Sequence, residues 1–273
     1  MKHTIWLFAT ALLLMGAEPA AAQSKTFNKT VQLSAGGALT LHATKGSVRL
    51  TGWDRDQVEI RARIESDSIS QRARRSVDAT TVDVATTGNR VTIRSNYEQV
   101  PSYIGIFGGW TTPEIHFEIR APKRMDLRLE IDRSETVISG FEGNIVLGLD
   151  RSEIEASDLT GDLRVRIDRG GDSSFRNIRG SINVEADRTN LRIDVMRFTG
   201  PSRIGINRGD ADVSVARGQG FELETSLSRR ADFDTNLAFR PRTRGSKNLS
   251  GPINGGGPRL SIEADRGRVR LSS

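Results

Sequence analysis

Residues 132–134 read Asp-Arg-Ser, and related tripeptides return at Asp150-Arg151-Ser152, Asp168-Arg169-Gly170, Asp187-Arg188-Thr189 and Asn207-Arg208-Gly209. The arginines of these five tripeptides are spaced 18, 18, 19 and 20 residues apart, and a degenerate copy, Ser228-Arg229-Arg230, follows 21 residues later. Self-similarity at a fixed period of this length indicates stacked supersecondary units. The stretch therefore predicts a repeat protein whose units are built alike.

A second marker runs in step with the first, as a glycine in each unit: Gly143, Gly161, Gly180, Gly200 and Gly220. Between the two markers the chain alternates apolar and polar residues, as in Ile145–Leu149, which is typical of half-buried strands. Two short strands and two turns per unit predict an all-β fold, a β-solenoid or β-helix with roughly 18–21 residues per coil over residues 123–239.

Stacked coils would bring equivalent residues into columns, because parallel strands lie about 4.8 Å apart. The expected interior columns are Leu127/Ile145/Leu163/Ile182 and Leu129/Leu147/Val165/Val184. A single coil cannot bury its apolar face alone, so the ends of the stack need covering.

The chain on either side of the repeats is also rich in strand patterns. Residues 23–122 alternate in segments such as Val58–Ile64 and Ile115–Ile119, and predict a β-rich N-terminal portion that caps the solenoid. One charged piece, Ser66–Asp78, is predicted as a helix. Residues 240–258 are predicted as a loop rich in Gly, Pro and Arg, and residues 259–273 as a final coil.

The first 22 residues have the pattern of a secretory signal peptide. A basic start at Met1–His3 precedes an apolar run, Ile5–Met15, and three alanines end at Ala22. The apolar run is too short to cross a bilayer as a helix, and no later stretch approaches that length. The mature chain is therefore expected to be exported, either periplasmic or secreted and cell-surface associated, with no transmembrane segment after cleavage.

The composition limits the classes of partner and cofactor that the chain is expected to bind. The chain has 40 Lys and Arg against 34 Asp and Glu, and the signs are interspersed, so no nucleic-acid partner is expected. It has no Cys, so stability must come from packing and hydrogen bonding. No cofactor motif is present, and none is expected to bind.

Three segments carry a resemblance to a known family. They are Lys45-Gly46-Ser47-Val48 to Gly52-Trp53-Asp54, the alternating Val58–Ile64, and Ile119-Arg120-Ala121-Pro122 followed by glycine-marked strand pairs. Together they resemble the bacterial "putative adhesin" β-strand-repeat domains of unknown function, over most of residues 30–273. Family members show Ser-Gly-Asp at the corners, where this chain has Asp-Arg-Ser or Asp-Arg-Gly. The resemblance implies an extracytoplasmic β-helical protein and assigns no functional residues.

The repeated arginines are the first candidate site. In stacked coils they would form a ladder able to bind a polyanionic glycan: Arg133, Arg151, Arg169, Arg188, Arg208 and Arg229. Alternatively, each Arg pairs with an Asp of its own or the adjoining coil. Stacked Asp residues also suggest calcium, but the nonapeptide pattern of calcium-binding repeats is missing, so no metal is expected.

The second candidate is an aromatic loop, residues 97–110. It contains Tyr97, Tyr103, Phe107 and Trp110 in a chain with 5% aromatic residues. Such a loop is either a lid over the open end of the solenoid or an exposed contact for a partner.

Catalytic residues are sparse. Only His42 and His116 remain after signal cleavage, and no Gly-x-Ser-x-Gly motif is present, so the chain is predicted not to be an enzyme. We expect an adhesin-like or scaffold module of the cell envelope, with an envelope polysaccharide or another envelope protein as partner. The alternatives are an envelope-stress partner-binding subunit and a polysaccharide-active β-helix enzyme. The enzyme would need one coil whose corner breaks the ladder with clustered carboxylates in a groove.

Overall fold

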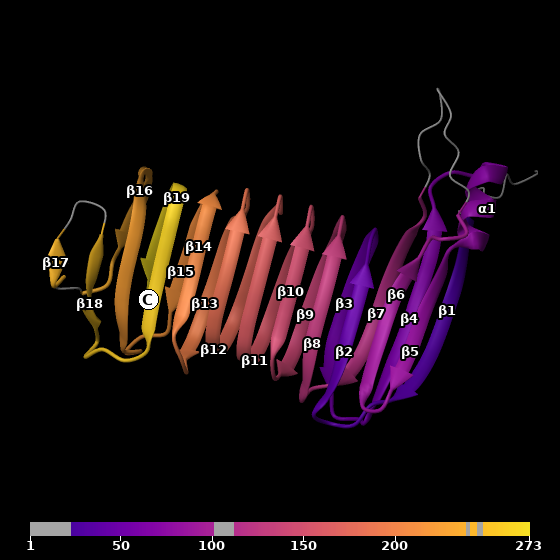
Figure 1. Ribbon diagram of the computed structural model, residues 1–273, viewed down its shortest axis with the longest axis horizontal. Coiled ribbons are helices and arrows are strands. Elements are labelled where there is room, and N and C mark those ends of the chain that lie inside the picture. Colours follow the sequence, from indigo (N-terminus) through magenta and orange to yellow (C-terminus); the bar gives the residue numbers. More distant parts are fainter. Residues whose placement is uncertain (1–22, 101–111, 239–240, 245–247) are drawn as a thin grey trace, which may run out of the picture.

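The computed structural model describes residues 23–100, 112–238, 241–244 and 248–273. The signal-peptide prediction for residues 1–22 lies outside this part of the chain. The described residues form one sheet of 19 strands and one helix, α1 (Gln71–Ala79), and Figure 1 shows the strands side by side along the long axis. No helix within these residues is long and apolar enough to cross a membrane.

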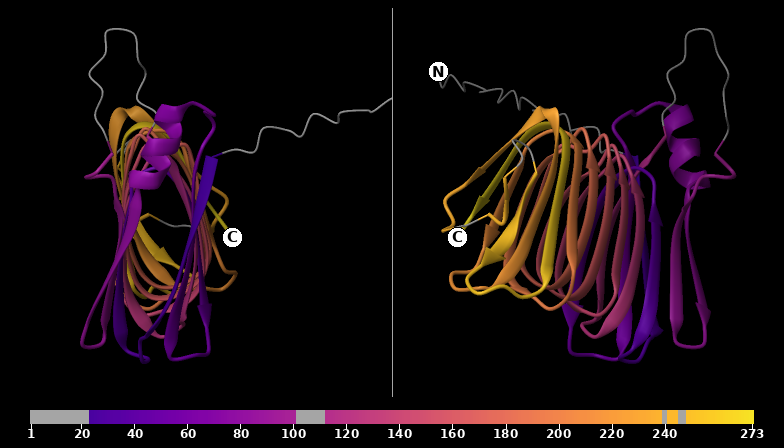
Figure 2. Two further views of the ribbon diagram at one scale, coloured as in Figure 1. Left: turned by 90° about the vertical axis from the view of Figure 1, so that its right-hand side faces the viewer. Right: turned by 60° about the vertical axis from the view of Figure 1, so that its left-hand side comes forward.

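The strands form two walls that face each other across the core (Figure 2). The β3 wall holds β1 (Gln23–Gln32), β4 (Gln57–Ser66), β7 (Glu114–Pro122), β3 (Gly46–Trp53), β9 (Ser134–Glu142), β13 (Asn190–Phe198) and β15 (Ala211–Val215). The β2 wall holds β5 (Thr81–Thr87), β6 (Arg90–Asn96), β2 (Gly37–Ala43), β8 (Met125–Asp132), β10 (Ile145–Asp150), β14 (Ser202–Arg208), β18 (Leu249–Ile253) and β17 (Thr243–Arg244). Four long strands run through both walls: β11 (Glu153–Asp168), β12 (Asp172–Asp187), β16 (Phe221–Thr235) and β19 (Arg259–Ser272).

The middle of the molecule is regular. Strands β8, β10, β11 and β12 pair in parallel, and their partners follow the two expected interior columns, which are thereby confirmed. Leu127, Ile145, Leu163 and Ile182 are each at most 2% exposed. Each unit thus contributes one apolar side chain to each interior column, as the alternating pattern requires.

The predicted fold class, a β-solenoid with two short strands per coil and a separate N-terminal cap, is wrong. Strands β11 and β12 are each 16 residues long and pass the glycine marker without a break. Strands β12, β13, β15, β19 and β14 close into a ring of five by parallel pairing. The N-terminal portion is also no separate cap, because β2 and β3 pair in parallel with β8 and β9.

The glycine marker explains the merged strands. Gly161 has a φ of +121°, and a Cβ there would lie 2.2 Å from the carbonyl oxygen of Gly143. Glycine lets the strand bend at this point while the ladder continues from Gly161 to Gly180. What the sequence pattern predicted as a turn between two strands is therefore a bend inside one strand.

At both ends of the sheet, a strand lies between two strands that are not its neighbours in the sequence. Strand β2 lies between β6 and β8, and β3 lies between β7 and β9. At the other end, β19 lies between β14 and β15 on one side and β16 on the other. The last strand of the chain is therefore not the last strand of the sheet (Figure 1).

The N-terminal end of the sheet is covered by α1 and by two lysines. Ser70 caps the helix by accepting a hydrogen bond from the Ala73 N–H. Lys25 Nζ of β1 donates to the Asp78 carbonyl oxygen, and Lys29 Nζ donates to that of Val84. Inward-pointing charges of this kind protect an edge strand from pairing with another chain.

Candidate functional site

The Asp-Arg corners are shaped by the backbone. Arg133, Arg151, Arg169 and Arg188 adopt left-handed φ values between 48° and 54°. The Arg133 N–H donates to the Asp150 carbonyl oxygen at 3.0 Å, and the next two units repeat this bond. The corner is therefore first a device that stacks one unit on the next.

The carboxylates of these corners neutralise the arginines. Arg151 lies 2.9 Å from Asp132 and 3.2 Å from Asp150, and Arg169 lies 2.9 Å from Asp150. The remaining pairs are Arg133–Asp132, Arg188–Asp187, Arg208–Asp187 and Arg169–Asp168, at 3.0, 3.2, 3.3 and 3.6 Å. Arg229 is exposed and has no ion pair within the described residues. Binding of a polyanion by this ladder stays a prediction.

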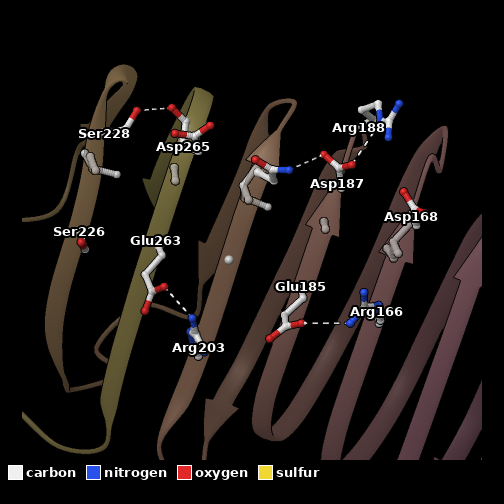
Figure 3. A pocket seen from close by; sticks show the side chains of 17 residues that line it. Arg166, Asp168, Glu185, Asp187, Arg188, Arg203, Ser226, Ser228, Glu263 and Asp265 are labelled. Carbon is white, nitrogen blue, oxygen red and sulfur yellow. Dashed lines mark hydrogen bonds and ion pairs between the residues drawn. The ribbon is translucent and has the colours of Figure 1, made fainter.

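The Asp column changes character after Asp187. The next unit has Asn207 at its corner, whose side-chain amide donates to Asp187 Oδ1 at 2.8 Å. Beside this break lies a groove of about 820 Å³, formed by β11, β12, β14, β19 and β16 (Figure 3). Its polar lining is Arg166, Asp168, Glu185, Asp187, Arg188, Arg203, Asn207, Ser226, Ser228, Glu263 and Asp265. We refer to this feature as the groove.

Gly205 creates the depth of the groove. It stands in register between Glu185 on β12 and Glu263 on β19, so that two carboxylates flank a position without a side chain. A Cβ added at Gly205 would meet nothing closer than the Val184 carbonyl oxygen, at 3.7 Å. The backbone therefore does not require glycine here, in contrast to Gly161.

Five carboxylates and three guanidinium groups line the groove. Arg203 Nη2 lies 2.6 Å from Glu263 Oε2, and this hydrogen bond raises the pKa of Arg203. Arg166 lies 3.9 Å from Glu185. Asp168 has a contact of 3.6 Å with Arg169, and the Asp265 carboxylate has no ion pair within the described residues. The groove is therefore rich in hydrogen-bond acceptors whose charge is mostly balanced.

This set of side chains suits a ligand with many hydroxyl groups. Carboxylate oxygens accept hydrogen bonds, while guanidinium, amide and hydroxyl groups donate them. Within the described residues, no group of three or more His, Cys, Asp and Glu side chains has the arrangement of a metal site. The groove lining contains no aromatic side chain among the described residues.

The aromatic loop is described only at its start. Tyr97 is partly buried against the core, and its hydroxyl donates to the Pro113 carbonyl oxygen at 3.2 Å. Burial raises the pKa of Tyr97 to about 12. Tyr103, Phe107 and Trp110 lie outside the described residues, so the lid and the partner contact both stay predictions.

The two histidines lie on opposite walls. His42 faces outward from β2, and burial, followed by the nearby Arg94, lowers its pKa. His116 on β7 has its Nδ1 2.9 Å from Ser47 Oγ and its Nε2 3.0 Å from Glu65 Oε1. The second contact lacks the alignment of a hydrogen bond. This Ser-His-Glu contact joins three separate strands and was not predicted.

One departure from the repeat in the sequence marks the groove, although the repeated residues themselves do not single it out. Aligned with earlier units, Gly205 takes the place of Glu185, and Asn207 stands near the place of Asp187. The flanking Glu263 comes from the last strand of the chain, and no local pattern places it beside β14. The complete site therefore required the strand order of the structure.

No protein-family model matches the chain, and no curated protein matches it. Among solved structures, a "putative cell adhesion protein" from Clostridium sporogenes is similar at 12% identity and a TM-score of 0.39, covering 91% of this chain and 99% of its own. A "putative adhesin" from Bacteroides fragilis is similar at 7% identity and a TM-score of 0.42, covering 91% and 96%. A "Putative lipid binding protein" from Parabacteroides distasonis is similar at 8% identity and a TM-score of 0.28, covering 90% and 96%.

Proposed function

We propose that this chain is an exported, adhesin-like interaction module of the cell envelope, and that it binds a glycan in the groove. The observation that carries the proposal is the gap at Gly205, flanked by Glu185 and Glu263, where the regular column of the sheet is interrupted. The predicted signal peptide supports an envelope location.

The chemistry of the lining supports a neutral, hydroxyl-rich glycan. Glu185 and Glu263 each contact an arginine, and their remaining lone pairs can accept bonds from sugar hydroxyls. Asn207 and Ser226 add neutral polar groups at the rim. Ligands of this kind are oriented by a few well-placed polar groups in a concave site.

Charged ligands fit the groove less well. A polyanion would face five carboxylates against three guanidinium groups. A cationic peptide would have to compete with arginines already bound to these carboxylates, as in the Arg203–Glu263 pair at 2.6 Å. Of the six arginines of the predicted polyanion site, only Arg188 also lines the groove, so the rest of the Arg ladder is a separate surface.

A glycan array with residues 23–273 tests the proposal. Three proteins are compared: the wild type, Gly205→Gln, which fills the groove, and the triple change of Arg133, Arg151 and Arg169 to Ser, three ladder residues that do not line the groove. We expect the wild type to retain neutral glycans, Gly205→Gln to lose them, and the triple variant to keep them. If the wild type retains only acidic glycans and the triple variant does not retain them, binding belongs to the Arg ladder instead.

A second candidate function is glycan hydrolysis, favoured by one observation. Two carboxylates lie on either side of Gly205 at a break in the ladder, two strand spacings or about 10 Å apart along the sheet. A pair of carboxyl groups can supply the acid and base of a glycosidase. To test this, the glycans that the array retains are incubated with the wild type and with Glu263→Gln. Hydrolysis predicts shortened glycans with the wild type and none with the variant.

A further inference from the structure

The groove belongs to a longer row of side chains on the outer face of the β2 wall. Parallel pairing places nine outward-facing residues in one row across nine strands, which we call the outer column. They are Arg94, His42, Glu130, Gly148, Arg166, Glu185, Gly205, Glu263 and Ser226. Two of the nine are glycines, so the row is interrupted twice.

The first interruption, at Gly148, borders a second hollow, and the Glu130 carboxylate lies over the glycine itself. A cavity of about 450 Å³ lies there, and His42, Glu130 and Asp150 contribute to its lining. It shares Arg166 and Asp168 with the groove. The two hollows therefore adjoin and form one track along the sheet.

The spacing of the two glycines sets a length for a ligand. Gly148 and Gly205 are separated by three strand spacings, or about 14 Å. Between them stand Arg166 and Glu185, 3.9 Å apart, with side chains 80% and 54% exposed. A single sugar cannot reach both hollows, whereas an extended oligosaccharide can.

We infer that the ligand is a linear glycan that lies along the outer column, perpendicular to the strands, with sugar residues seated at both Gly205 and Gly148. The inference rests on the proposed function and specifies the length and direction of its ligand. Sugar hydroxyls between the two hollows bond to Arg166 and Glu185. Without an aromatic platform each sugar binds weakly, so affinity must accumulate over linked contacts.

Both hollows can be filled without rebuilding the backbone. A Cβ at Gly205 is 3.7 Å from its nearest neighbour. A Cβ at Gly148 would lie 2.3 Å from Glu130 Oε2, which is the far end of a flexible side chain and can move aside. Neither glycine has a left-handed φ. Ser174→Gln, an outward-facing change on β12 in the β3 wall, is the matched control.

The test uses an array of neutral gluco-, manno- and N-acetylglucosamine oligomers, from disaccharides to decasaccharides. For the wild type we expect affinity to rise about tenfold or more with length. Gly205→Gln should lose binding at every length, whereas Gly148→Gln should lose about tenfold for the long oligomers and nothing for disaccharides. Ser174→Gln should match the wild type.

The outcomes separate this inference from the proposed function. If the wild type binds disaccharides and long oligomers equally, or if Gly148→Gln retains full affinity for long oligomers, the inference is overturned and the groove stands alone. If the wild type retains no neutral oligomer, the proposed function and the inference both fail. Should Gly148→Gln melt below the control, the smaller Gly148→Ser and the wild-type length profile decide.

Discussion

The regular middle of the molecule, residues 125–187, differs from its two ends in how strands find their neighbours. In the middle, each unit pairs with the unit next to it in sequence, and its corners repeat the same Asp-Arg contacts. At the ends, β2, β3 and β19 are inserted between strands that are distant in the chain. The groove lies in the interlaced C-terminal part, which indicates that regular units supply the scaffold and that the departures from regularity supply the site.

The largest predicted effect comes from removing the inserted strand. Ending the chain at Pro258 deletes β19 and leaves β14, β15 and β16 without a partner on one side. We expect residues 202–258 to become sensitive to protease, since their edges and core are exposed together. In a simple end-on stack, losing the last unit would spare the rest. Limited proteolysis with mass spectrometry measures the difference, and an intact 202–258 segment would contradict the interlaced order.

Glycines in the two regions should respond differently to alanine. Gly161→Ala forces a Cβ into the Gly143 carbonyl at a positive φ, and should cost about 2–4 kcal/mol of unfolding free energy. Gly205→Ala meets no neighbour closer than 3.7 Å and should change stability by no more than about 0.5 kcal/mol. Urea unfolding of the two variants gives both numbers. Equal losses would mean that Gly205 has a structural role.

Burial of Tyr97 gives the N-terminal end a dependence of stability on high pH. Burial raises its pKa from 10.0 to about 12, so the folded state keeps the proton that the unfolded state releases. Its contribution to stability is full below pH 10 and declines as the pH rises from 10 toward 12. The melting temperature of the wild type should therefore fall more steeply between pH 10 and 12 than that of Tyr97→Phe, which has no phenol to ionise. An unchanged high-pH slope in Tyr97→Phe would assign the loss elsewhere.

The smallest effect is predicted for a corner carboxylate. Asp150→Asn removes contacts with Arg151 and Arg169, whose side chains are each 46% exposed, and should cost at most about 1 kcal/mol. This loss should shrink in about 1 M salt. Glu263→Gln in the groove should have an equally small effect on stability but should weaken glycan retention. A large, salt-independent loss at Asp150 would contradict the surface character of the ladder.

The regular units were predictable from the sequence because two periods coincide there. Alternation along each strand fixes which side chains face the core, and the spacing of the Asp-Arg tripeptides fixes the vertical register. The columns through Leu127 and Leu129 follow directly. The pairing of each corner Arg with Asp was one of the two alternatives that the pattern left open.

The strand order at the ends and the merged strands were not predictable. Nothing near β19 specifies that it lies between β14 and β16, because parallel pairing joins residues about 60 positions apart, as in Arg203 and Ser261. The glycine marker looks like a turn in sequence, although at Gly161 it bends a continuous strand. Both errors arise because local patterns describe a strand's faces but not its neighbours.

Hydrogen exchange tests directly whether the interrupted outer column is a binding site. The wild type is measured with and without the longest oligosaccharide that it retains on the array. We expect added protection in β12, β14 and β19 around Glu185, Gly205 and Glu263, extending to Gly148. Protection confined to the Asp-Arg corners or to α1, or no change at all, would contradict it.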